Sequence, residues 1–110
     1  MKTLTKTTLL GAMALLISSQ LSAADASIDE GKTLYKKCAA CHGQNGERKA
    51  MGKSNIINEL DEATVEQRLA GYKDGSYGGS MKGIMKGQVA NYNDTQIKSL
   101  AMYISSIKKD

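Results

Sequence analysis

Cys38-Ala39-Ala40-Cys41-His42 is the stretch of this sequence that decides its fold. It contains both cysteines and the only histidine of the 110 residues. Cys-x-x-Cys-His is the attachment motif of c-type haem, in which two thiols form thioethers with the porphyrin and the histidine binds the iron. The motif therefore predicts one covalent haem c, with Cys38 and Cys41 as the attachment residues and His42 as the proximal iron ligand.

Three other kinds of site share parts of this motif. A thioredoxin-like redox dithiol would follow a β-strand, whereas the segment before Cys38 is predicted to be helical. A structural zinc ion takes four ligands, and only three candidates are present here unless a carboxylate is recruited. A short disulfide between Cys38 and Cys41 is the third alternative. We favour haem because it uses both thiols and the imidazole together.

The first 24 residues are typical of an export signal. Two lysines precede an apolar run at residues 9–17, and small residues follow it. This run is much shorter than the roughly 20 residues that span a bilayer as a helix. We therefore expect cleavage after Ala23 or Ala24, a monohaem domain over residues 25–110, and a periplasmic protein that is not anchored in the membrane.

The domain that remains after cleavage is small. The sequence has no Trp, Phe or Pro, and a chain of about 86 residues forms only a marginal hydrophobic core. An embedded porphyrin would supply the large apolar body that the side chains lack. Loss of Lys2 and Lys6 with the leader lowers the formal net charge from +4 to +2, which argues against nucleic acid as a partner.

Helix signals occur in three places along the domain. Ser27 and Glu30 form the S-x-x-E pattern of a capping box, and the helix they begin is predicted to continue to about residue 37. Asp61 is placed to cap a second helix that ends near Gly71 or Gly75. A shorter helical turn is expected over residues 83–90.

The last helix has the clearest pattern. Asn93 and Gln96 form a polar cap, and the helix is predicted to run to about residue 107. Its apolar stripe at helical spacing consists of Ile97, Leu100, Ala101, Ile104 and Ile107. Two long irregular segments, residues 43–59 and 74–80, are expected to wrap around the haem, because loops of this length in a small domain usually serve a function.

The layout resembles the class I cytochromes c and, among them, the small bacterial cytochromes of the c-553 type. The resemblance rests on residues 35–43 (YKKCAACHG), 49–53 (KAMGK), 71–79 (GYKDGSYGG) and 100–104 (LAMYI). It implies an all-α class I cytochrome c fold, with three to four helices and long loops around one covalent haem. It also implies that the first helix crosses the last one closely, with Gly31 and Tyr35 packed near Ile104.

The distal iron ligand is predicted to be a methionine, because the chain has no second histidine. Two methionines are less suitable as this ligand. Met51 lies only nine residues after His42, on a loop that must round the haem edge to reach the opposite face. Met102 lies inside the last helix but off its apolar stripe. Met81 and Met85 are spaced i and i+4, so they share one helical face and the residues alone do not separate them.

The resemblance separates these two methionines. In that family the iron-binding methionine follows the Tyr-Gly-Gly segment, eight residues beyond its tyrosine. Counted from Tyr77, this position is Met85, and Met81 is the alternative. A His/Met pair raises the reduction potential relative to more basic ligand sets.

Further contacts to the haem are expected from the loops. Tyr72 and Tyr77 are candidates for hydrogen bonds to a propionate or for packing on the ring. His42 needs an acceptor for its second ring nitrogen, and the resemblance implies a backbone carbonyl near Ile56. Seven lysines could surround the haem edge and attract an acidic partner: Lys36, Lys37, Lys49, Lys53, Lys73, Lys82 and Lys86.

A haem iron with two protein ligands has no open position for a substrate. The expected function is therefore one-electron transfer by a monomeric, non-enzymatic carrier between redox protein partners. A membrane oxidase, a quinol-oxidising complex or a dehydrogenase could be such a partner. The alternative is a haem enzyme or gas-sensor module, in which the sixth ligand must be easily displaced.

Overall fold

All the regular secondary structure in the described part of the chain is helical. The computed structural model describes residues 25–107, so the predicted leader, residues 1–24, lies outside it, as do residues 108–110. The elements in chain order are α1 (Ile28–Tyr35), α2 (Ala39–His42), the 3-10 turns η1 (Ala50–Gly52) and η2 (Ile57–Glu59), α3 (Glu62–Asp74), α4 (Lys82–Val89) and α5 (Asp94–Ser106). The predicted all-α class is confirmed, and the four-residue α2 is the one helix that the sequence did not predict.

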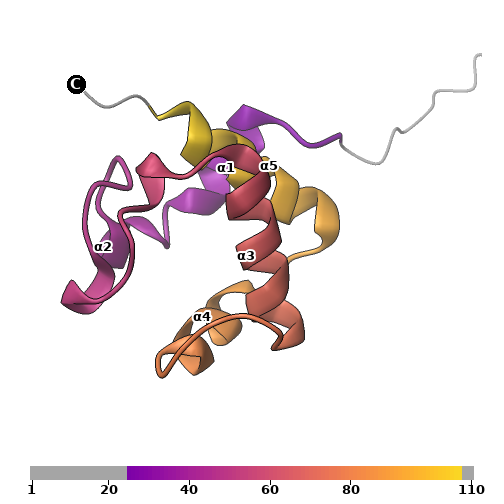
Figure 1. Ribbon diagram of the computed structural model, residues 1–110. Helices are drawn as coiled ribbons and strands as arrows, with labels where there is room; N and C mark the ends of the chain where they lie inside the picture. The colour runs from indigo at the N-terminus through magenta and orange to yellow at the C-terminus, as the bar shows by residue number, and fades with distance from the viewer. Residues whose placement is uncertain (1–24, 108–110) are drawn as a thin grey trace, which may run out of the picture.

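The first and last described helices cross in close contact, as Figure 1 shows for α1 and α5. Gly31 makes this approach possible, because a Cβ atom at this position would lie 2.0 Å from the Ser99 carbonyl oxygen and 2.7 Å from the Tyr103 Cβ. The Tyr35 ring packs on Tyr103 with 5.3 Å between ring centroids. The crossing expected for Gly31 and Tyr35 is thus present, with Ser99 and Tyr103 as the direct contacts.

The start of α1 differs from the predicted capping box. The Ser27 hydroxyl accepts a hydrogen bond from the Glu30 N–H at 3.1 Å, which is one half of such a box. The Ser27 N–H, however, donates to the Ser99 hydroxyl at 3.0 Å. A tertiary contact with α5 therefore takes the place of the local bond that the pattern predicts.

The end of α1 also differs. The helix stops at Tyr35, two residues earlier than predicted, and the Cys38 N–H donates to the Tyr35 carbonyl at 2.8 Å in a tight turn. This turn leads into α2, for which Cys38 is the N-cap residue. The break separates the haem motif from α1 and gives it a helical turn of its own.

The other helix boundaries follow the predicted signals. The Asp61 carboxylate accepts from the Thr64 N–H at 2.7 Å, and α3 ends at Gly75, which adopts the left-handed conformation with φ 85°. Asn93 and Gln96 form a complete capping box at α5, with bonds of 2.8 and 2.9 Å. Helix α4 occupies the predicted short helical turn to within one residue at each end.

The core lies where α3 and α4 meet α1 and α5. Four of the five residues of the predicted α5 stripe are buried in it, and Ile107 is half-buried. The buried apolar side chains are Tyr35, Val65, Leu69, Val89, Tyr92, Ile97, Leu100, Ala101 and Ile104. This core holds α3 in place and leaves one face of it directed toward the haem motif.

Candidate functional site

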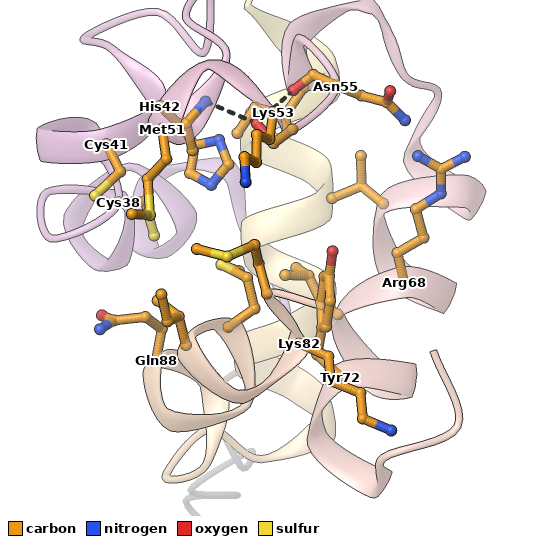
Figure 2. A pocket seen from close by; sticks show the side chains of 18 of the residues that line it. Cys38, Cys41, His42, Met51, Lys53, Asn55, Arg68, Tyr72, Lys82 and Gln88 are labelled. Atoms are coloured by element: carbon orange, nitrogen blue, oxygen red, sulfur yellow. Dashed lines mark hydrogen bonds between the residues drawn. The ribbon is translucent and has the colours of Figure 1, made fainter. Parts of the chain in front are cut away.

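A single cavity brings the predicted site residues together. It has a volume of about 570 Å³, and its walls come from α2, the segment between residues 50 and 60, α3, the loop after α3, and α4 (Figure 2). This volume falls within the range of ligand and cofactor pockets. Every haem contact and iron ligand predicted from the motif and the resemblance lines it, namely Cys38, Cys41, His42, Tyr72, Tyr77, Met81 and Met85.

Cys38 and Cys41 lie one helical turn apart at the α2 wall, where both thiols are free. Cys38 is half-buried and Cys41 is exposed. Burial raises the pKa of the Cys38 thiol, and the nearby Lys37 ammonium opposes that shift. Figure 2 shows both side chains beside His42 at the same end of the cavity.

The alternatives to haem find no support in this geometry. The two cysteines are not joined as a disulfide, and helix α1 rather than a strand precedes them. Among residues 25–107, no three Cys, His, Asp or Glu side chains gather in a cluster that could hold a zinc ion. The motif thus presents two separate thiols and one imidazole to the cavity.

His42 is buried at the end of α2 with its ring in the cavity wall (Figure 2). Burial lowers the pKa of its imidazole, so the neutral form that can bind a metal is favoured. Its Nδ1 atom is buried and has no hydrogen-bond partner. Buried polar atoms are nearly always paired. We therefore expect the imidazole to gain a partner, either from a bound group or from a neighbouring acceptor after a small shift.

The expected acceptor for His42 is not in place. The Ile56 carbonyl accepts a hydrogen bond from the Glu59 N–H at 3.2 Å and makes none with the imidazole. The position of the His42 backbone is instead fixed by neighbouring bonds. The Arg48 N–H donates to the His42 carbonyl at 2.9 Å, and the Tyr35 hydroxyl donates to the Gly43 carbonyl at 2.6 Å.

Two methionines from α4 reach the cavity. Met81 is the N-cap residue of the helix and Met85 lies one turn later; both are half-buried. Met85 also packs against the hydrophobic core. A thioether supported by the core is held more firmly than one at an uncapped helix start, so packing favours Met85 as the ligand.

The other two methionines are less suitable. Met51 lines the cavity but is 64% exposed, and its backbone adopts the left-handed conformation with φ 53°. Met102 is half-buried on α5 and does not line the cavity. Neither combines a position at the cavity with support from the core.

Tyr72 and Tyr77 form the α3 side of the cavity together with Arg68. The two rings meet edge to face, with centroids 5.0 Å apart, and the Arg68 guanidinium lies 5.4 Å from the Tyr77 ring centroid. Arg68 was not predicted from the sequence. Its position one helical turn before Tyr72 was the available signal, because residues four apart share a helix face. A guanidinium here is suited to bind a carboxylate such as a haem propionate.

The seven candidate lysines do not act as one group. Lys37, Lys53 and Lys82 line the cavity, whereas the other four do not. Lys37 and Lys73 each donate a hydrogen bond to a backbone carbonyl, those of Gln88 and Tyr92 respectively. Only three of the seven lysines predicted around the haem edge therefore lie at the cavity. Lys37 and Lys73 also make contacts within the protein.

Comparison with known proteins agrees with this site. The family model "Cytochrome c" matches residues 28–108 of the chain. This protein belongs to the cytochrome c family. The matched region includes the attachment motif, the cavity walls and both helices of the crossing.

Cytochromes c-553 are among its most similar relatives. The chain is 44% identical to the Helicobacter pylori (strain 26695) protein over 77 residues, which cover 70% of this chain and 77% of the relative. It is 38% identical over 78 residues to that of Nitratidesulfovibrio vulgaris, covering 71% and 76%. It is also 38% identical over 79 residues to that of Desulfomicrobium norvegicum, covering 71% and 96%.

These relationships establish a small haem c electron carrier of the cytochrome c-553 type. The cofactor of the family is a covalently bound haem c, and the spacing of Cys38 and Cys41 matches its attachment motif. In residues 25–107, no helix has the length and apolar character needed to cross a membrane.

Proposed function

We propose that this cytochrome is a periplasmic one-electron carrier with a single haem c bound through Cys38 and Cys41 and ligated by His42 and Met85. The observation that supports this most strongly is that α2 and α4 contribute these residues to one cavity. The donor set fits a covalent haem, because it offers two free thiols on one turn, an imidazole that burial keeps neutral, and a core-supported thioether.

The residues of the chain have separate tasks in this proposal. The thioethers of Cys38 and Cys41 would fix the ring, while His42 and Met85 would ligate the iron from elements far apart in the sequence. When bound, the haem would supply an iron that exchanges one electron. Ligation by these two side chains in both oxidation states would keep substrates from the iron and limit structural change on electron transfer.

Tyr72, Tyr77 and Arg68 are proposed to bind the propionates. Their side chains meet at one wall of the cavity, and burial raises the pKa of the Tyr72 hydroxyl, which therefore stays protonated as a donor. A positive guanidinium close to a propionate would offset part of its negative charge.

The location and partners form the second part of the proposal. Residues 1–24 are proposed to be a leader cleaved after Ala23 or Ala24, which would release residues 25–110 into the periplasm. There the monomeric carrier would exchange electrons with a membrane oxidase, a quinol-oxidising complex or a dehydrogenase. Lys53 and Lys82, which line the cavity, would favour an acidic docking surface.

The experiment that tests the ligand set is spectroscopy of protein matured in a periplasm. We expect haem that stays attached after denaturation and a weak near-infrared sulfur-to-iron band in the ferric protein. M85A should lose this band, and M81A is the matched control because it removes the alternative thioether from the same helix and should retain it. Loss of the band in M81A alone would assign the ligand to Met81.

The same preparation separates a carrier from a haem enzyme or gas sensor. Reduced wild-type protein should bind carbon monoxide slowly or not at all, because Met85 occupies the position that the gas needs. M85A should bind it readily. Rapid binding by the untreated wild-type protein would refute the carrier mechanism and favour a module with a displaceable ligand.

A further inference from the structure

Lys37 joins the haem attachment turn to the distal helix. It directly precedes Cys38, and its ammonium donates a hydrogen bond of 2.7 Å to the Gln88 carbonyl in the last turn of α4. The same ammonium lies 4.4 Å from the centroid of the Tyr92 ring. Figure 2 shows Gln88 at the end of the cavity that also holds Cys38.

This contact suits the chemistry of a helix end. The last four carbonyls of a helix have no partner within the helix and carry its partial negative charge, so a cation placed there is favoured. The Tyr92 ring adds a cation–π contact to the same ammonium. Lys37 is thus more than a solvated surface charge, although its side chain is largely exposed.

A second lysine holds the segment that follows α4. Lys73, in the last turn of α3, donates to the Tyr92 carbonyl at 2.5 Å. The Tyr92 N–H donates to the Val89 carbonyl at 3.0 Å, and both side chains are buried. The carboxyl end of α4 is therefore fixed by contacts from two other parts of the chain.

The amino end of α4 has less support. Its N-cap residue, Met81, makes no side-chain capping bond. A Cβ atom at Gly83, in the first turn, would meet nothing within 4 Å, so this face of the helix start is not packed. Met85 lies only three residues before Gln88, and its position consequently depends on the anchored end.

We propose that Lys37 is a positioning residue for Met85. By holding the end of α4 next to the attachment turn, it would keep the thioether in place as an iron ligand and make its replacement by other ligands less favourable. This inference rests on the proposed ligation by His42 and Met85. It also gives Lys37 a role different from docking, since its ammonium is already engaged within the molecule.

The test measures how readily an external ligand replaces Met85. Imidazole is titrated into the ferric holoprotein of wild type, K37Q, K37R and K36Q, and loss of the near-infrared band is recorded. K36Q is the matched control, because it removes the same charge one residue away at an exposed side chain. K37R retains the cation and its donors.

We expect imidazole to bind K37Q about fivefold more tightly than wild type, the effect of an exposed charged hydrogen bond and cation–π pair worth about 1 kcal/mol. K36Q should change less than twofold, and K37R should recover most of the wild-type value. If K37Q does not load haem, K37M, which retains most of the aliphatic stem, takes its place. Equal imidazole affinities in K37Q and K36Q would overturn the proposal.

The ligand assignment is checked independently of Lys37. If the near-infrared band persists in M85A, the proposed ligand itself is wrong. If M85A lacks the band but K37Q binds imidazole as K36Q does, Met85 remains the ligand and only the positioning role of Lys37 is refuted. The two failures are therefore distinguishable.

Discussion

The helix scaffold, made of α1, α5 and the core-facing side of α3, differs sharply from the remaining cavity walls, which are formed by α2, η1, η2 and α4. Helix α5 alone has five buried residues, whereas α4 has one and the two 3-10 turns have none. The scaffold is held by side chains that contact one another. The walls face a cavity, so much of their packing must come from the bound haem.

The largest expected effect is that the elements forming the cavity walls unfold when haem is absent. In C38S/C41S, which cannot attach the cofactor, we expect the helical circular dichroism signal to fall by more than about half, because so small a chain lacks a sufficient core. Hydrogen exchange should show residual protection in α1 and α5 and none in α4.

The outcome that would contradict this contrast is an apoprotein with protected amides throughout α4. Such a result would mean that the walls are stable by themselves. A single-cysteine variant, C41S, serves as an intermediate, since one thioether can still hold the ring.

The next largest effect is expected from a comparison of two glycine substitutions, one in the scaffold and one in a cavity wall. In G31A the added methyl group would collide with the Ser99 carbonyl, and we expect a loss of about 3 kcal/mol or more in unfolding free energy. G87A in α4 meets nothing within 4 Å and should gain up to about 1 kcal/mol from its better helix propensity. Urea unfolding of the two holoproteins measures both values.

A third prediction concerns Tyr35, which links the scaffold to the haem motif. Y35F removes the 2.6 Å bond to the Gly43 carbonyl and should cost about 1.5 kcal/mol at neutral pH. Burial is the main cause that raises the pKa of Tyr35 from 10.0 to about 12. The hydroxyl keeps its proton in the folded state after the unfolded chain has lost it.

The sign of the pH effect follows from that difference. Stability from this group is fully present below pH 10 and is lost as the pH rises toward about 12. Wild type should therefore lose more stability than Y35F between these values, measured as the difference between their urea midpoints. A parallel loss in both proteins would show that Tyr35 does not cause it.

The smallest effect tests the charge at the α3 wall. R68Q should lower the reduction potential by roughly 20 mV, the equivalent of about 0.5 kcal/mol for loss of one positive charge near a partly solvated group. R48Q is the control, because Arg48 is exposed and does not line the cavity. Equal potentials in the two variants would exclude a special role for Arg68, as judged by redox titration.

Sequence reasoning succeeded where the determining signal is local. The Asn93–Gln96 cap of α5 was predicted, because its residues lie within one turn of each other, and Gly75, the C-cap of α3, is one of the two glycines predicted for that end. The apolar stripe of α5 was also predicted from the sequence, because its helical spacing depends on that helix alone, and four of its five residues are buried.

The predictions failed where distant residues compete with local ones. The capping box at Ser27 is only half formed because Ser99, 72 residues away, takes its N–H. The early end of α1 and the separate α2 arise at the haem motif, where helical propensity does not determine the turn. The contacts of Arg68 and Lys37 were missed for a related reason: their partners Tyr77 and Gln88 approach only in the folded chain.

The bond between Ser27 and Ser99 also sets an order of events in time. A chain is made from its amino end, so the two cysteines exist well before α5 has been synthesised. Closure of a loop of this length must wait for its last segment, and contacts so far apart in sequence form slowly. The crossing of α1 and α5 therefore cannot close until the last helix is present, and until then this contact does not hold α1, the helix that leads into the attachment turn.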